Sequence, residues 1–158
     1  MNILFIASEV ESFAKTGGLA DVAKALPLAL KRRGHDVRIV MPYYASIAGR
    51  EKSQHLGGFT LPTRPGHTDI PYQVRQMELD DVPVLLIDFP NYFDRKSLYA
   101  ENNNAYADNG ERFAFFSAAC LQVSEQIGFK PDIVHCNDWH TALVPMLLKT
   151  RYANNSFF

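Results

Sequence analysis

Apolar residues along this chain follow two spacings, which alternate from the N-terminus onwards. Residues 2–8 (NILFIAS) are rich in β-branched and aromatic side chains without strict alternation, which is typical of a strand covered on both faces in a parallel sheet. Apolar residues then recur at helical spacing from Leu19 to Leu30, and Gly34 follows as a helix stop. With a second strand at residues 36–42, the pattern predicts a βαβ unit with a right-handed crossover.

The rest of the chain continues this alternation after an excursion over residues 43–69, where glycine, proline and polar residues dominate and one short strand is predicted at 57–63. Two strands are predicted at residues 71–79 and 82–90, followed by a long polar loop suited to binding at 89–107. A helix at 109–129, a strand at 131–137 and a last helix at 138–152 come next, and Pro145 indicates that the first turn of the last helix begins nearer Thr141 than Asp138. The helix at 109–129 has one apolar face made of Phe113, Phe116, Cys120, Val123 and Ile127. The final three residues, SFF, resemble the start of a further strand.

This order of elements predicts an α/β fold with a doubly wound, mostly parallel sheet and helices on both faces. A chain of 158 residues of which 47% are apolar suits one domain with a real core. Pro27 lies inside the first predicted helix, where it is expected to remove a hydrogen bond and introduce a kink.

Charge and composition narrow the classes of partner. The net charge of −1 gives no electrostatic argument for nucleic acid or an anionic membrane, and no run approaches the roughly 20 apolar residues of a membrane helix. The first apolar run has no basic stretch before it, so a secretory signal is not expected. Cys120 and Cys136 are expected to be free thiols, which suits a cytoplasmic protein.

The first candidate site is the glycine turn in KTGGLADV, at the carboxyl end of the first strand. Gly17 and Gly18 allow close approach of a ligand, the helix start favours an anion such as phosphate, and Lys15 adds positive charge. Asp21 favours the helix dipole or accepts a hydrogen bond from a ligand hydroxyl. The stretch matches neither GxGxxG nor the P-loop pattern. The alternative is a tight strand-to-helix turn with a solvated Lys15.

The second and third candidates also lie where loops meet helices. In HCNDWH, Trp139 offers an aromatic wall, and Asp138 and His140 offer hydrogen bonds to a ligand; the alternative is a helix cap and a buried polar group. No distant matching ligand is evident, so a metal is not expected there. In YADNGERF, Asp108 or Asn109 caps the helix, or Asp108 faces the crevice. Aspartate, asparagine, histidine and aromatic residues together are the side chains used in sugar recognition.

Four segments, in consistent order, carry a resemblance to a known family. ILFIASEV with KTGGLADV, then ALPLALKRRGHDVRIVMPYY, YADNGERFAFF and PDIVHCNDWHTALVPMLLK closely resemble the N-terminal domain of bacterial glycogen synthase and plant starch synthase, over residues 1–152. The resemblance implies a retaining glucosyltransferase that moves glucose from ADP-glucose to the non-reducing end of an α-1,4-glucan such as glycogen. It also implies the GT-B arrangement of two Rossmann-like domains, without a metal or other cofactor.

The same resemblance implies roles for individual residues. Lys15 is associated with the donor, Gly17 and Gly18 approach its phosphates, and Asp21 belongs to that motif. Asp108 lies near the reacting sugar. His140 contacts the donor glucose beside the anomeric carbon. Many relatives have a different pair before the DWH aspartate, so no role is expected for Asn137.

The resemblance further implies that residues 1–158 are a truncated, acceptor-side N-terminal domain, and that the C-terminal nucleotide-sugar domain is absent. The chain alone is therefore expected to be catalytically inactive, because half a cleft cannot orient both substrates or exclude water. Two alternatives remain at this stage. One is a stand-alone glucan-binding module, and the other is a flavodoxin-like domain for a phosphorylated ligand.

Overall fold

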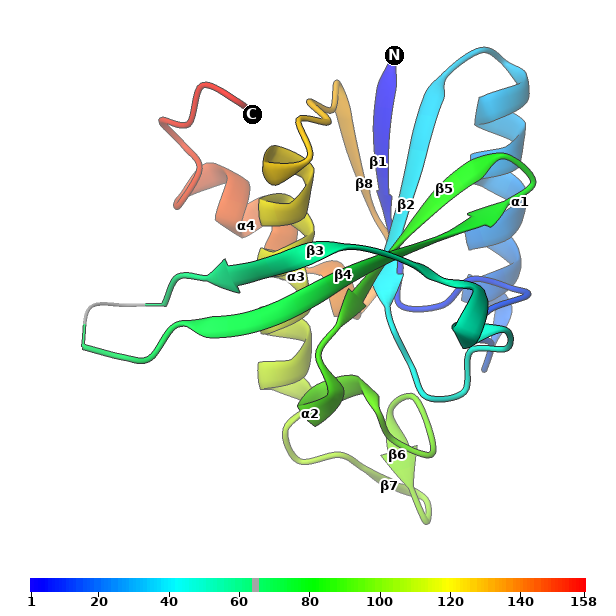
Figure 1. Cartoon of the computed structure of the whole chain (residues 1–158), viewed down its shortest axis with the longest axis vertical. Coiled ribbons are helices and arrows are strands. Elements are labelled where there is room, and N and C mark those ends of the chain that lie inside the picture. Colours follow the sequence, from blue (N-terminus) through cyan, green and yellow to red (C-terminus); the bar gives the residue numbers. More distant parts are fainter. Residues whose placement is uncertain (64–65) are drawn as a thin grey trace.

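The computed structural model describes residues 1–63 and 66–158, which form one central sheet with helices packed on it (Figure 1). The sheet has six strands in the order β3-β4-β5-β2-β1-β8. The strands are β1 (Asn2–Ile6), β2 (Asp36–Pro42), β3 (Gln54–Leu61), β4 (Ile70–Leu79), β5 (Val82–Asp88) and β8 (Ile133–Cys136). The four strands β5, β2, β1 and β8 are parallel, whereas β4 and β3 continue the sheet in antiparallel pairing.

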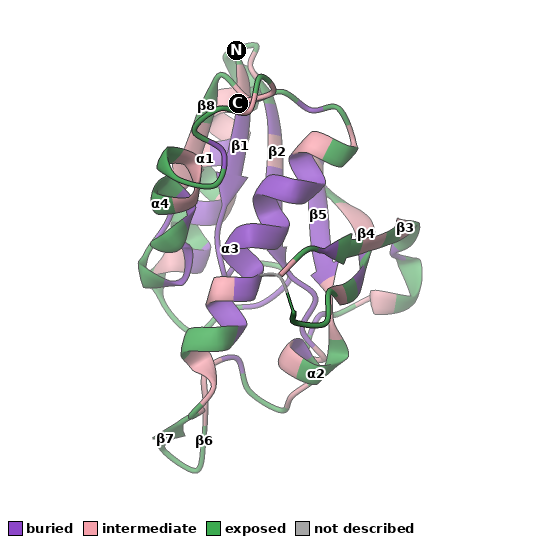
Figure 2. Cartoon of the chain, turned by 90° about the vertical axis from the view of Figure 1, so that its left-hand side faces the viewer, coloured by how far each residue is buried: buried purple, intermediate pink, exposed green. Residues whose placement is uncertain are grey.

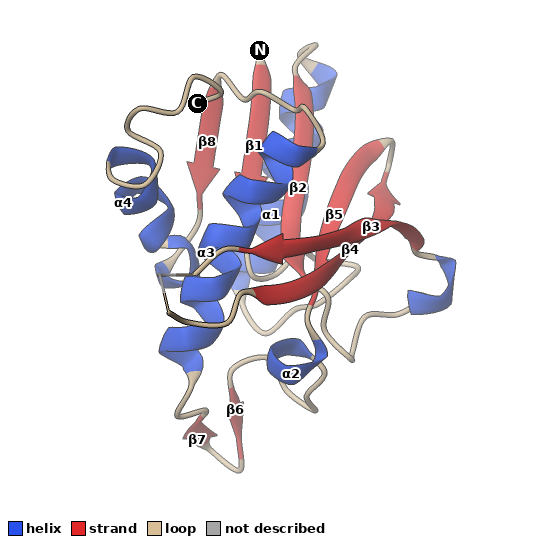
Figure 3. Ribbon diagram, turned by 60° about the vertical axis from the view of Figure 1, so that its left-hand side comes forward, coloured by secondary structure: helices blue, strands red, loops and turns tan. Residues whose placement is uncertain are grey.

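Two long helices make the crossovers between the parallel strands. Helix α1 (Gly18–Arg32) joins β1 to β2, and α3 (Asn109–Gln126) leads back from the β5 side to β8. Since right-handed crossovers that run in opposite directions along a sheet place their helices on opposite faces, α1 and α3 lie on either side of it, as Figure 3 shows. The predicted doubly wound, mostly parallel α/β fold is thereby confirmed.

Shorter elements complete the chain. They are η1 (Arg50–Lys52), α2 (Pro90–Phe93), β6 (Ala100–Glu101), β7 (Asn104–Ala105), η2 (Trp139–Thr141) and α4 (Leu143–Lys149). Helix α1 runs from Gly18 to Arg32 although Pro27 lies inside it. The last predicted helix is divided, with a 3-10 turn before α4.

The core lies between the parallel strands and α3, as the purple segments of Figure 2 show. The predicted face of α3 is buried except at Ile127, which is partly buried. Phe115 and Leu121 are buried as well, because α3 contacts the sheet, η2, α4 and β3 on its different sides. The helix is therefore buried on more than the one apolar face that the sequence predicted. Cys120 and Cys136 are free thiols, as predicted.

One prediction about the end of the chain is wrong. Residues 156–158 are in turns and irregular structure rather than in a strand. The Phe157 N–H donates to Asn155 Oδ1 at 2.7 Å, and the Phe158 ring packs on Tyr152 with centroids 5.0 Å apart. The Phe157 N–H is therefore bound to a side chain two residues away instead of to the backbone carbonyl of a neighbouring strand.

Candidate functional site

Doubly wound sheets bind ligands at the carboxyl ends of the two strands between which the direction of winding changes. In this chain these strands are β1 and β8. The chain runs from β1 to β2 on one side of β1 and later returns to β8 on the other side, so the direction of winding changes between β1 and β8. Loops that leave the sheet at such a switch point diverge and leave a crevice. Here these loops are residues 7–17 and 137–138, which carry the glycine turn and the start of the DWH motif.

Asn137 ties the two strand ends together. Its Nδ2 donates to Ile6 O at 2.9 Å and lies 3.2 Å from Nδ1 of His135, whose ring stacks on Phe5 with centroids 4.8 Å apart. The Asn137 side chain is 9% exposed. This contact was not evident from the sequence, since Ile6 is 131 residues away. Asn137 thus has a structural role at the edge of the crevice.

The glycine turn is held in shape by Glu9, a buried carboxylate that the sequence analysis missed. Glu9 accepts hydrogen bonds from Thr16 N at 2.5 Å, Thr16 Oγ1 at 2.6 Å and Gly17 N at 3.2 Å. Tyr99 OH donates to the same carboxylate at 2.8 Å and also lies 2.8 Å from Ser8 Oγ. Burial opposes the charge, but the hydrogen bonds outweigh it and keep the pKa of Glu9 below its usual value.

Gly17 and Gly18 adjoin open space. A Cβ built on either residue meets no atom within 4 Å, and neither backbone has a positive φ. The chain's own packing and conformation therefore do not require glycine at either position. A ligand that approaches the backbone closely would use the space. The N–H of Gly18, at the first position of α1, has no acceptor within the helix and is available to an anion.

Lys15 and Asp21 lie together at the mouth of the turn. Lys15 Nζ is 2.5 Å from Asp21 Oδ1, with side-chain exposures of 48% and 57%. An ion pair so exposed adds little to stability. The hydrogen bond that Lys15 donates to Asp21 keeps the pKa of Lys15 above its usual value. The structure thus brings all four residues predicted in the glycine turn to one place, with the lysine charged.

His140, in η2, is buried and makes no hydrogen bond through either ring nitrogen in the part of the chain that the structure describes. Its ring lies 4.0 Å from Trp139, 4.5 Å from Tyr99 and 4.7 Å from Phe113, measured between centroids. Burial lowers the pKa of His140 to about 4, in spite of the opposing effect of the Asp138 carboxylate. The imidazole is therefore neutral at physiological pH. It offers one donor and one acceptor.

A hollow of about 210 Å³ adjoins His140 and Trp139. Its lining is Asn109, Gly110, Phe113, Ala114, Trp139, His140, Ala142 and Leu143. Trp139 is half exposed and forms an aromatic part of this lining. Asp138 has a positive φ of 63°, and its Oδ1 accepts the Trp139 N–H at 2.6 Å. It therefore caps the 3-10 turn η2, which was the alternative role considered for it.

Asp108 lies at the start of α3, and its carboxylate is bound to Arg95. Arg95 Nη1 donates to Asp108 Oδ1 at 2.8 Å, and Nη2 donates to Oδ2 at 2.5 Å. The hydrogen bond from Arg95 keeps the pKa of Asp108 below its usual value. Asp108 makes no side-chain cap to α3. It neighbours Asn109, which lines the hollow, but is not itself in the lining.

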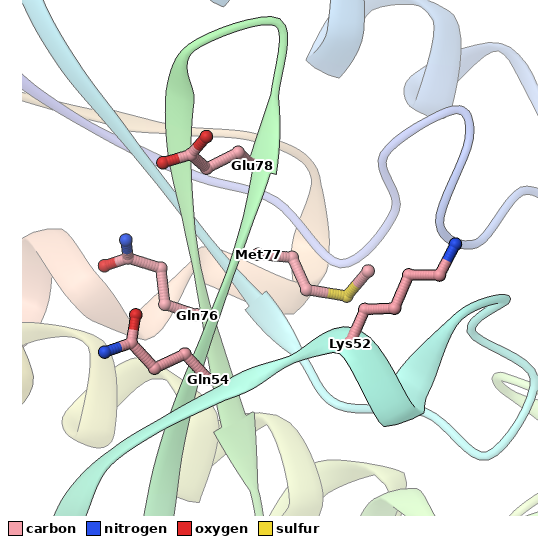
Figure 4. Close-up of a pocket in the computed structure, with 5 residues that line it drawn as sticks. All are labelled: Lys52, Gln54, Gln76, Met77 and Glu78. Carbon is pink, nitrogen blue, oxygen red and sulfur yellow. The ribbon is translucent and has the colours of Figure 1, made fainter.

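A larger hollow, of about 360 Å³, lies at the β3-β4 hairpin, away from these residues. Figure 4 shows that Gln54, Gln76 and Glu78 point to one side of the hairpin, whereas Met77 and Lys52 point to the other. The five residues line this hollow from the two sides of the hairpin, and none of them belongs to the candidate motifs found in the sequence. The smaller hollow is therefore the better candidate site.

Two negative findings concern metals and membranes. Among residues 1–63 and 66–158, no group of three or more His, Cys, Asp or Glu side chains is arranged to hold a metal ion. Within the same ranges, no helix is both long enough and apolar enough to cross a membrane.

The order of the parallel strands, with helices on both faces, places the chain in the class of doubly wound, Rossmann-like α/β domains. The chain belongs to the starch synthase catalytic domain family, whose model matches residues 2–158. It is thus a member of a glycosyltransferase family. The resemblance drawn from the four segments is confirmed, and the matches give no support to a stand-alone glucan-binding module or a flavodoxin-like domain.

Individual relatives agree with this assignment. The chain is 62% identical to a glycogen synthase of Aeromonas salmonicida over 158 residues, which is all of this chain and 32% of that protein. A glycogen synthase of Photobacterium profundum is 58% identical over the same length, which is 31% of that protein. The chain thus spans about a third of the length of the curated relatives it matches.

A solved structure shows the same fold. It is the catalytic domain of starch synthase IV from Arabidopsis thaliana bound to ADP and acarbose. The TM-score is 0.82 at 33% identity, and the match covers 96% of this chain and 31% of that chain.

Proposed function

We propose that this chain supplies one side of the active site of a retaining glucosyltransferase. The reaction is transfer of glucose from ADP-glucose to the non-reducing end of an α-1,4-glucan such as glycogen, in the cytoplasm. The observation that carries the proposal is the imidazole of His140, neutral and without a hydrogen-bond partner among the described residues, beside a hollow lined by the start of α3 and the η2-α4 segment. The glycogen synthases to which the chain is similar, and the ADP and acarbose bound to the plant starch synthase, agree with it.

In the proposed mechanism His140 acts through its dipole rather than through a charge. A retaining transfer passes through an oxocarbenium-like transition state, and a cationic imidazolium beside it would be unfavourable. The depressed pKa of His140 keeps the ring neutral, so that a ring nitrogen can hydrogen-bond a donor sugar hydroxyl beside the anomeric carbon. Trp139 would pack against the sugar, and Asp138 would hold η2 in place.

The donor diphosphate would lie at the glycine turn. Gly17 and Gly18 leave room for its oxygens, the start of α1 favours negative charge, and Lys15 would leave Asp21 to meet it. Asp108 would contact hydroxyls near the reacting sugar. No metal or other cofactor is needed in this scheme, because the protein groups and the phosphates of the donor carry the charges.

We further propose that residues 1–158 are the acceptor-side N-terminal domain and that a C-terminal domain, outside these residues, holds most of the nucleotide. The chain spans about a third of its relatives' length, which agrees with this division. The purified chain is then expected to show no glucose transfer from ADP-glucose to glycogen. Measurable transfer would contradict the need for a second domain.

The test of the site is an NMR titration of the chain with maltoheptaose and, separately, with ADP-glucose. Saturable binding of maltoheptaose is expected, weakened at least tenfold in Asp108→Ala, and the response to ADP-glucose is expected to weaken in His140→Gln, because His140 is proposed to contact the donor glucose. His67→Gln, at an exposed position, is the matched control and should bind as the unsubstituted chain does. Tight ADP-glucose binding without any binding of maltoheptaose would mean that the acceptor role is assigned to the wrong domain.

A further inference from the structure

Arg95 lies in none of the sequence motifs and has no role in the proposed mechanism. It lies between α2 and α3, and its Nη2 donates to Asn91 O at 3.2 Å in addition to the two bonds to Asp108. Its guanidinium carbon lies 4.7 Å from the centroid of the Tyr106 ring. Arg95 therefore has a planar partner on one face and two carboxylate oxygens at its edge, which fixes its orientation.

The Arg95–Asp108 pair differs from the Lys15–Asp21 pair in its geometry and in its exposure. It is bidentate, and the side-chain exposures of Arg95 and Asp108 are 24% and 32%. By comparison, Lys15 and Asp21 share a single contact and are about half exposed. A sheltered bidentate pair restricts both side chains far more than an exposed single contact does.

The Arg95–Asp108 pair also joins the two ends of the segment 96–107. Tyr99 lies in this segment and reaches across the crevice to Ser8 and Glu9 at the glycine turn. The segment is therefore fixed at its base by the Arg95–Asp108 pair and near its middle by Tyr99. Loosening the base would free both the carboxylate and the segment that carries Tyr99.

Arg95 is the charged group that hydrogen-bonds the Asp108 carboxylate, and the other charged and titratable groups nearby act on it from a greater distance or have other partners. Arg112 contributes positive charge, but its Nε and Nη1 donate to Tyr92 O and Asn109 Oδ1. The phenols of Tyr92 and Tyr106 and the carboxylate of Glu111 are the remaining groups around the pair.

The hydrogen-bonding capacity of the carboxylate is not exhausted by this pair. Two carboxylate oxygens provide about four lone-pair positions, and Arg95 occupies one on each oxygen. The remaining positions can accept hydroxyl hydrogens. A carboxylate held ionised in this way accepts hydrogen bonds but does not donate a proton.

We propose that Arg95 is a positioning residue for sugar recognition: it fixes the Asp108 carboxylate so that its remaining lone pairs accept hydroxyl hydrogens of a bound glucosyl unit. This inference rests on the proposed function, which places Asp108 near the reacting sugar. It assigns Asp108 the role of a hydrogen-bond acceptor and excludes it as a general acid.

The test compares Arg95→Gln and Arg95→Lys with the unsubstituted chain in two measurements. The first is NMR titration with maltoheptaose and with ADP-glucose. The second is the pH titration of the Asp108 carboxyl carbon by NMR without a ligand. Lys96→Gln is the control, because the Lys96 side chain is 87% exposed and lies beside Arg95 in the sequence.

Arg95→Gln is expected to weaken sugar binding at least tenfold and to move the Asp108 titration to higher pH, and Arg95→Lys is expected to recover part of both. Arg95→Gln combined with Asp108→Asn should bind no more weakly than Asp108→Asn alone. Sugar binding and an Asp108 titration that are both unchanged in Arg95→Gln would overturn the proposal.

Two further outcomes are informative. If the unsubstituted chain binds neither maltoheptaose nor ADP-glucose, the proposed function fails. The ligand-free pH titration still decides whether Arg95 keeps the Asp108 carboxylate ionised. If Arg95→Gln does not fold, Arg95→Lys carries the test. Its single ammonium keeps the charge but loses the bidentate contact, so binding equal to that of the unsubstituted chain would contradict positioning by Arg95.

Discussion

His140 shows how burial alone can decide the protonation state of a side chain. The ring is 3% exposed and enclosed by three aromatic side chains, and its nitrogens have no hydrogen-bond partner among residues 1–63 and 66–158. Its pKa of about 4 lies below the usual 6.5. An unfolded chain therefore takes up a proton at His140 at a higher pH than the folded chain does.

From this difference we predict the acid stability of the chain. The contribution of His140 is fully present above about pH 6.5 and is lost as the pH falls towards 4, with a total on the order of 3 kcal/mol. In urea denaturation, His140→Gln should lose less stability than the unsubstituted chain between pH 7 and pH 4. His67→Gln, at an exposed position, is the control. Equal losses of unfolding free energy between pH 7 and pH 4 in the unsubstituted chain and in His140→Gln would show that His140 does not cause the acid destabilisation.

A second prediction separates folding from ligand binding at Gly18. Gly18→Ala should leave the free energy of unfolding within about 0.5 kcal/mol or raise it, because the added Cβ meets no atom within 4 Å and alanine favours helix. Binding of ADP-glucose should nevertheless weaken, because the Cβ would occupy space that the proposed mechanism gives to the donor phosphates. Gly128→Ala offers a contrast, since its φ of 69° makes alanine destabilising by about 1 kcal/mol. The checks are urea denaturation and calorimetry, and unchanged ADP-glucose binding in Gly18→Ala would argue against phosphate contact there.

The elements β1 and β8 are neighbours in space although most of the chain separates them. Their pairing covers four registered residue pairs from Ile3 with Ile133 to Ile6 with Cys136. The Asn137 side chain extends this pairing by one further hydrogen bond, to Ile6 O, where backbone pairing has ended. The width of the crevice therefore depends on this side chain as well as on the backbone.

We predict that Asn137→Ala destabilises the chain by about 1–3 kcal/mol, because it removes the donor to Ile6 O in a buried position. Denaturant unfolding measures the effect. Asn154→Ala, at an exposed position, should stay within about 0.5 kcal/mol. Equal stabilities of the two variants would show that the Asn137 bond is not made in solution.

Across the whole molecule, burial falls from the centre of the sheet to its β3 edge. Residues 4–6 of β1 are fully buried, whereas β3 is mostly exposed and pairs only with β4 in the described sheet. Native-state hydrogen exchange should therefore be slowest in β1 and β2 and much faster in β3 and in the small β6-β7 pair. Mass-spectrometric exchange measures this directly. Protection in β3 equal to that in β1 would indicate a partner along its free edge.

The sequence predicts most of the fold because its signals are local. The run at residues 2–8 and the helical spacing after Gly18 each lie within one element, and they were confirmed. The strand expected at residues 156–158 was wrong because a short aromatic run cannot show whether a neighbouring strand exists to pair with it.

The candidate site was only partly predictable. The glycine turn and the DWH segment were found because each is a compact motif. Glu9, Tyr99 and Arg95 were missed, since each acts through a partner whose position only the folded chain defines; Tyr99, for example, reaches Glu9 across 90 residues. No pattern in the sequence marks such a pairing.

The Glu9 carboxylate has a consequence for the thermodynamics of ligand capture. By binding Thr16 N, Thr16 Oγ1 and Gly17 N, it orders the turn during folding, before any phosphate arrives. The conformational entropy of those residues is then lost on folding and not on association. A phosphate that meets the remaining N–H groups of α1 should therefore bind with only a small entropic penalty from the turn.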